Sequence, residues 1–221
     1  MEAFAPILRR VGALWIVVGL IDIGAMVYAI KNQISYSSSF NIFALIAGLY
    51  VYRQSLRAAK FVTAASAFFL TGLAWLILIF PMLQPLDLWT VQIRLFPVYW
   101  LGSFLFAGVV VAALAWTYLQ LRRPAVLNAL EAAHMSSKPP KLAIGIALVL
   151  VSFLTVMMLT VLFGPDGKEA KRRAAQALGS QYRYHVNRVN WHGNSVSADV
   201  TAYSENEIRN VPVTWDKKDS S

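Results

Sequence analysis

Five apolar stretches, separated by short basic breaks, constrain this chain more than any other feature of its sequence. They cover residues 11–30, 36–52, 61–80, 98–121 and 142–163. A helix needs about 20 apolar residues to cross the hydrocarbon core of a bilayer, and repeated runs of this length are not typical of a soluble core. The sequence therefore predicts a mainly α membrane protein, in which residues 1–163 form a five-helix transmembrane bundle in contact with a lipid bilayer.

The composition agrees with this prediction. Charged residues make up only 14% of the chain and hydrophobic residues 57%, whereas a soluble domain has about 25% charged residues. The chain has no cysteine. That excludes disulfides, thiolate nucleophiles, and cysteine-bound zinc or iron–sulfur centres.

The second stretch is the weakest of the five. Its strictly apolar part, residues 42–52, would cover only about half of a bilayer at 1.5 Å per residue, so a re-entrant loop is the alternative to a crossing. We favour a crossing because the next break holds Arg53, Arg57 and Lys60 and no acidic residue, as expected for a cytoplasmic turn.

The distribution of Lys and Arg predicts an orientation. With the N-terminus inside, nine basic residues fall on the inner side and two in the short outer breaks. Segments rich in Lys and Arg therefore alternate with segments poor in them at every crossing. We therefore expect a cytoplasmic N-terminus and a periplasmic C-terminus in a bacterial inner membrane. The inner residues are Arg9, Arg10, Arg53, Arg57, Lys60, Arg122, Arg123, Lys138 and Lys141, and the outer ones are Lys31 and Arg94.

Two of the breaks contain apolar residues of their own. Residues 81–97, which follow the expected end of the third span at Pro81, are too apolar to lie free in water, and we expect them along the outer membrane interface, where Trp is enriched. Residues 125–134 are typical of a short amphipathic helix, and residues 136–141 of a linker.

Residues 164–221 are predicted to form a small α+β module outside the membrane. A turn at 164–167 ends the fifth span, and residues 168–178 are expected to form a helix that Gly179 stops. The apolar pattern then changes to a period of two, with turns at 191–194 and 204–207. This pattern predicts a three-stranded antiparallel meander with a bulge near Arg188.

A module of roughly 55 residues buries little apolar surface by itself. We expect its own helix, the membrane surface, a second copy or a protein partner to cover the Tyr/Val/Trp face of its sheet. The surface expected to meet such a partner carries Tyr182, Tyr184, Trp191 and Trp215. Aromatic and basic residues alternate here as in some nucleic-acid surfaces, but an extracytoplasmic position argues against nucleic acid as the partner.

Asp22 is the only acidic residue inside an apolar stretch. It neighbours Gly19, and small residues on that face let another helix approach closely, so we expect Asp22 to face the bundle rather than lipid. A role in proton or ion transfer is one reading. The other is a structural acid satisfied by hydroxyl groups of neighbouring helices, and the lack of a cationic partner within the spans favours it.

Four basic residues follow the fifth span, at Lys168, Lys171, Arg172 and Arg173. They could contact lipid head groups, or they could form the solvated face of a short helix. The histidines, His134, His185 and His192, all lie outside the spans, which excludes bis-histidine haem in the bundle. We expect His185 and His192 in exposed strand and turn positions, without a bound metal.

No phosphate-binding glycine loop, metalloprotease motif, nucleophile elbow or dinucleotide fingerprint occurs in the sequence. We therefore expect no catalytic residues and no cofactor. The leading hypothesis is a non-enzymatic membrane protein that anchors a partner-binding module, as an accessory or assembly factor of an envelope complex. The alternative is a transporter or channel subunit that uses Asp22, and a lipid-modifying enzyme is the third reading.

Overall fold

The computed structural model describes residues 3–33 and 41–216, and the chain divides into two compact units. One unit comprises Met1–Thr71 and Val110–Ala147, and the other Gly72–Val109 and Leu148–Ser221. We refer to them as unit 1 and unit 2. The predicted division into residues 1–163 and 164–221 follows expected membrane position rather than contacts, and it stays a prediction.

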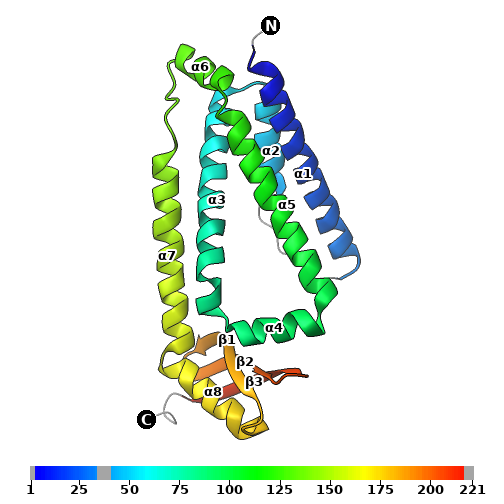
Figure 1. Ribbon diagram of the computed structural model, residues 1–221, viewed down its shortest axis with the longest axis vertical. Helices are drawn as coiled ribbons and strands as arrows, with labels where there is room; N and C mark the ends of the chain where they lie inside the picture. Colours follow the sequence, from blue (N-terminus) through cyan, green and yellow to red (C-terminus); the bar gives the residue numbers. More distant parts are fainter. Residues whose placement is uncertain (1–2, 34–40, 217–221) are drawn as a thin grey trace. The chain divides into compact units, whose positions relative to one another are not determined.

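The described part of the chain is mainly helical (Figure 1). Four of its helices are long and apolar enough to cross a membrane, which is compatible with a multi-pass membrane protein. These four are α1 (Ala5–Lys31), α3 (Leu56–Leu83), α5 (Pro97–Leu121) and α7 (Lys141–Phe163). The shorter helices are α2 (Asn41–Tyr52), α4 (Leu86–Leu95), α6 (Pro124–Ala132) and α8 (Pro165–Leu178).

Helix α2 is the reason the predicted number of spans stays a prediction. It has 12 residues, which rise only about 18 Å. The first part of the predicted second span, residues 36–40, lies outside the described residues.

Within unit 1, helices α1 and α2 pack antiparallel with their backbones almost in contact. A Cβ atom placed on Gly12 would lie 2.3 Å from the backbone nitrogen of Tyr52, and one placed on Gly48 would lie 2.8 Å from that of Ile16. Both glycines are needed because any side chain would push the helices apart. The apolar core of the unit surrounds this contact and includes Leu8, Val11, Val51, Leu121 and Val126.

Unit 2 contains the three-stranded antiparallel sheet that the sequence predicts. Its strands are β1 (Arg183–His192), β2 (Ser195–Tyr203) and β3 (Ile208–Asp216), in the order β1-β2-β3. The register shifts between Val186 and Arg188, so the expected bulge is confirmed.

Helix α8 covers the apolar face of this sheet (Figure 1). Ala170 and Ala174 of α8 form one core with Val186, Val200 and Trp215, and Leu162 at the end of α7 joins it. Two alanines on one helical face allow the helix to lie close to the strands. Helix α8 is therefore one of the elements that were expected to cover the apolar face of the sheet.

Three of the helix boundaries that differ from the prediction involve a proline. Helix α1 begins at Ala5 with a proline in its first turn, so it includes Arg9 and Arg10, which precede the predicted start at residue 11. Helix α8 likewise begins at Pro165, and only Gly164 of the predicted turn lies outside it. Proline favours the first turn because its missing N–H needs no partner there. Conversely, α3 continues through Pro81 for two residues, to Leu83.

Two more local structures differ from the prediction. The break at 81–97, which was expected to lie along the outer membrane interface, contains an unpredicted helix, α4. Strand β1 extends to His192, so the first turn of the meander is shorter than residues 191–194. Gly193 lies in that turn with a φ of +62°, which a side chain would strain.

Candidate functional site

Helix α4 positions the acidic side of the site. Leu88 and Val91 are buried on one face of this helix. The ring of Trp89 packs 4.7 Å from Phe80, 5.8 Å from Trp100 and 5.9 Å from Phe104, measured between ring centroids. These contacts tie α4 to the flanking helices α3 and α5 and hold Asp87, in its first turn, at the surface.

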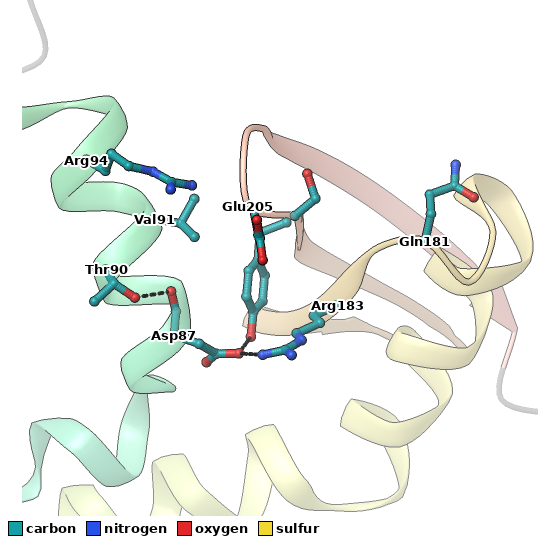
Figure 2. A pocket seen from close by; sticks show the side chains of 9 residues that line it. Asp87, Thr90, Val91, Arg94, Gln181, Arg183 and Glu205 are labelled. Atoms are coloured by element: carbon teal, nitrogen blue, oxygen red, sulfur yellow. Dashed lines mark hydrogen bonds and ion pairs between the residues drawn. The ribbon is translucent and has the colours of Figure 1, made fainter.

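The Asp87 carboxylate joins α4 to the sheet (Figure 2). It forms an ion pair with Arg183 of β1. It also accepts a hydrogen bond from the hydroxyl of Tyr203 in β2, at 3.0 Å, and another from the backbone N–H of Leu88, also at 3.0 Å. Arg183 and Tyr203 are paired across the two strands, so the sheet register brings both donors to one carboxylate. We call these three side chains the Asp87 junction.

The junction favours ionised Asp87 and protonated Tyr203. Partial burial opposes the charge of Asp87, but hydrogen bonds from Arg183, Tyr203 and Leu88, together with the charge of Arg183, lower the pKa of Asp87 below its usual value. Burial, followed by the hydrogen bond to Asp87 and its negative charge, raises the pKa of Tyr203 to about 12.

A half-open cleft of about 570 Å³ lies beside the junction. Two arginines and two acidic residues line it, so its formal charges cancel. Arg94 extends from α4 toward the turn that carries Glu205 (Figure 2). The lining residues are Asp87, Thr90, Val91, Arg94, Gln181, Arg183, Tyr203, Ser204 and Glu205.

Asp22 and Gly19 lie together on α1 but not in this cleft. Gly19 is buried and Asp22 is half-buried. Gly12, seven residues before Gly19 on the same face of α1, lies against the backbone of α2. The role of Asp22 stays a prediction.

The four basic residues after α7 lie on α8 and have different surroundings. Arg172 and Arg173 both form ion pairs with Glu169, at 2.5 and 2.7 Å. The Lys171 ammonium lies 5.3 Å from the centre of the Phe163 ring, and Lys168 lines a shallow hollow with Glu169. Two of the four charges are thus engaged within the helix, and head-group binding by this set stays a prediction.

The aromatic residues predicted to meet a partner make contacts within unit 2. Trp215 is only 4% exposed, and the Arg173 guanidinium lies 5.6 Å from its ring. Tyr182 donates a hydrogen bond to Glu207, and Tyr184 donates one to the carbonyl of Gly179. Trp191 donates to Asp166 and is the most exposed of the four, at 43%.

The expectation that His185 lies exposed is wrong. His185 is buried on the face of the sheet opposite α8, where it pairs with the buried Thr201. Burial and the nearby charge of Lys171 lower its pKa, against the opposing effect of Asp87. His192 is exposed at the end of β1, as expected. No group of three potential metal ligands occurs among the described residues.

From the sequence, Arg94 was expected only as a basic residue of an outer break, and Asp87 was not predicted as a site residue. The signal that could have distinguished Asp87 is a carboxylate in an apolar break at the start of a helical pattern. No local pattern connects it to Arg183, which is 96 residues away. Comparison of the chain with protein families, curated proteins and solved structures found no match.

Proposed function

We propose that this chain is a non-enzymatic, multi-pass protein of a bacterial inner membrane that presents its α+β module to a protein partner. It crosses the membrane five times, with a cytoplasmic N-terminus and a periplasmic module. Its role is that of an accessory or assembly factor within an envelope complex.

The observation that carries this proposal is the Asp87 junction. It ties a charged module to α4, a short helix whose neighbours along the chain are long and apolar. Many side chains of those apolar helices are exposed, among them Val98 at 84% and Phe106 at 72%. Such surfaces are expected to contact lipid, and a module attached to them at several points is held in a defined orientation for a partner.

Co-purification tests the proposal. The tagged full-length chain, extracted in a mild detergent, should retain a stoichiometric protein partner. Replacing Trp191 by Ala should reduce that retention at least severalfold, because aromatic side chains supply much of the energy of protein interfaces, while Trp191→Phe should retain more. A chain that migrates alone from its native membrane would contradict the proposal.

One observation favours a second function, a transporter or channel subunit. A half-buried carboxylate, Asp22, lies within the 27-residue apolar helix α1, and acids in such helices often serve ion or proton transfer. Asp22→Asn should then abolish ion-coupled flux in vesicles at unchanged protein levels. Equal flux in the variant would exclude this function.

A further inference from the structure

The cleft beside the Asp87 junction contains two charged side chains, Arg94 and Glu205, that do not belong to the ion pair of the junction. Arg183 and Asp87 are paired with each other. Within the described part of the chain, neither the Arg94 guanidinium nor the Glu205 carboxylate has a hydrogen bond or an ion pair, and both side chains are exposed. A positive and a negative group thus stand on different walls of one cleft.

This pair of charges indicates the chemistry of a ligand. An arginine fork binds phosphate oxygens through paired N–H groups, and a carboxylate accepts hydrogen bonds from an ammonium group. The four charged lining residues sum to zero, so the cleft has no excess positive charge to favour a purely anionic head group. A zwitterion that carries a phosphate and an ammonium fits both walls.

The position of the cleft indicates the source of that ligand. Arg94 is on α4, which lies in the chain between the apolar helices α3 and α5. In the proposed membrane arrangement, α4 lies at the depth of the lipid head groups. A volume of about 570 Å³ is within the usual range of small-molecule sites and leaves ample room for a head group.

We propose that the cleft binds the head group of phosphatidylethanolamine, with the phosphate at Arg94 and the ammonium at Glu205. The choline head group lacks N–H donors for Glu205, and the glycerol head group lacks the positive charge. Both are therefore weaker ligands. The inference rests on the membrane location given under the proposed function.

Native mass spectrometry of the full-length protein in detergent tests this assignment. Phosphatidylethanolamine, phosphatidylcholine and phosphatidylglycerol with identical acyl chains are titrated separately. The wild-type protein should bind phosphatidylethanolamine about tenfold more tightly than the other two, as expected for one additional charge-assisted contact. Equal affinity for the three lipids would overturn the proposal.

Two variants locate the site. Arg94→Ala should weaken phosphatidylethanolamine binding about tenfold, with partial recovery in Arg94→Lys. Glu205→Gln should remove the preference over phosphatidylglycerol. Arg188→Ala is the matched control, because Arg188 is an exposed arginine of the same module outside the cleft. Wild-type binding by both cleft variants would overturn the proposal, and if Arg94→Ala does not fold, Glu205→Gln decides alone.

A soluble ligand with the same chemistry is distinguished by competition. Free O-phosphoethanolamine should displace the lipid only at far higher concentration, and displacement at equal concentration would overturn the assignment to a lipid. Loss of lipid preference in a chain that still co-purifies with a protein partner would overturn this inference alone. Absence of a partner with lipid preference retained would contradict only the proposed function.

Discussion

At the scale of single residues, two acidic side chains of unit 2, Glu169 and Asp87, have arginine partners. Glu169 accepts hydrogen bonds from Arg172 and Arg173, and Asp87 accepts them from Arg183 and Tyr203. In both cases the folded state favours the ionised carboxylate. The charge of these residues therefore contributes to stability at neutral pH and ceases to do so in acid.

The contribution of Glu169 to stability should depend on pH. Hydrogen bonds from Arg172, followed by those from Arg173 and both positive charges, lower the pKa of Glu169 to about 2, against an opposing effect of burial. The stabilisation is complete above the ordinary pKa of 4.5 and is lost as the pH falls toward 2. Glu169→Gln should reduce the loss of unfolding free energy between pH 5 and pH 3, by about 1 kcal/mol or less because solvent screens the pair.

Thermal unfolding of the purified protein in detergent, followed by circular dichroism, measures this effect. Asp199→Asn serves as the control, because this acidic residue lies on β2 away from the cleft and from Glu169. The assignment fails if Glu169→Gln loses as much stability as the wild-type protein over the same pH interval.

Asp87 should help to hold the sheet of the module against α4. Asp87→Asn removes the ion pair with Arg183 and weakens the hydrogen bond from Tyr203, so α4 and β1 should exchange their amide hydrogens faster. The expected cost is about 1 kcal/mol, because the Asp87 and Arg183 side chains are 39% and 73% exposed. Since the pKa of Asp87 is lowered from 3.8, wild-type protection should persist at neutral pH and decrease below about pH 4.

Hydrogen exchange with peptide-level mass spectrometry checks this result in the detergent-solubilised protein. Tyr203→Phe is an informative companion, since it removes one donor and keeps the charge pair, and it should have the smaller effect. Unchanged exchange in Asp87→Asn would mean that other contacts hold the module.

At the scale of elements, the packing of α1 on α2 depends on two small residues. A Cβ at Gly12 would lie 2.3 Å from the backbone of Tyr52, whereas one at Gly24 on the same helix would meet nothing within 4 Å. Gly12→Ala should destabilise the protein by about 1–3 kcal/mol through overpacking. Gly24→Ala is the matched control and should be neutral or slightly stabilising, because alanine has the higher helix propensity.

Thermal denaturation of the two variants in the same detergent separates these effects. Equal melting temperatures for Gly12→Ala and Gly24→Ala would contradict the close backbone contact. The two melting temperatures also report on α2, because a 12-residue helix has little stability of its own and depends on packing.

At the scale of the whole molecule, the natural lack of cysteine makes the topology accessible to experiment. Single cysteines at Gln33, Ser136 and Asn194, three exposed positions, can be labelled in intact cells with a membrane-impermeant maleimide. Five crossings predict labelling at Gln33 and Asn194 and protection at Ser136. If the second stretch does not cross, Ser136 becomes labelled with Gln33, and Asn194 becomes protected.

Much of the architecture followed from the sequence because it depends on local periodicity. Apolar runs of helical length predicted α1, α3, α5 and α7 to within a few residues at their C-terminal ends. Alternation at Val196, Ala198 and Val200 predicted a strand with one buried face, and all three are buried. The length of an apolar run, its period and the turn residues beside it all depend on neighbouring positions. They can therefore be read from the sequence without knowledge of the rest of the fold.

Only the tertiary structure determined which residues far apart in the chain are in contact. The Asp87 junction joins positions 87, 183 and 203, and Gly12 is critical only because α2 returns antiparallel beside it. The cleft that contains Arg94 and Glu205 exists only after α4 and the β2–β3 turn come together. Such contacts depend on how elements pack, which local periodicity does not encode.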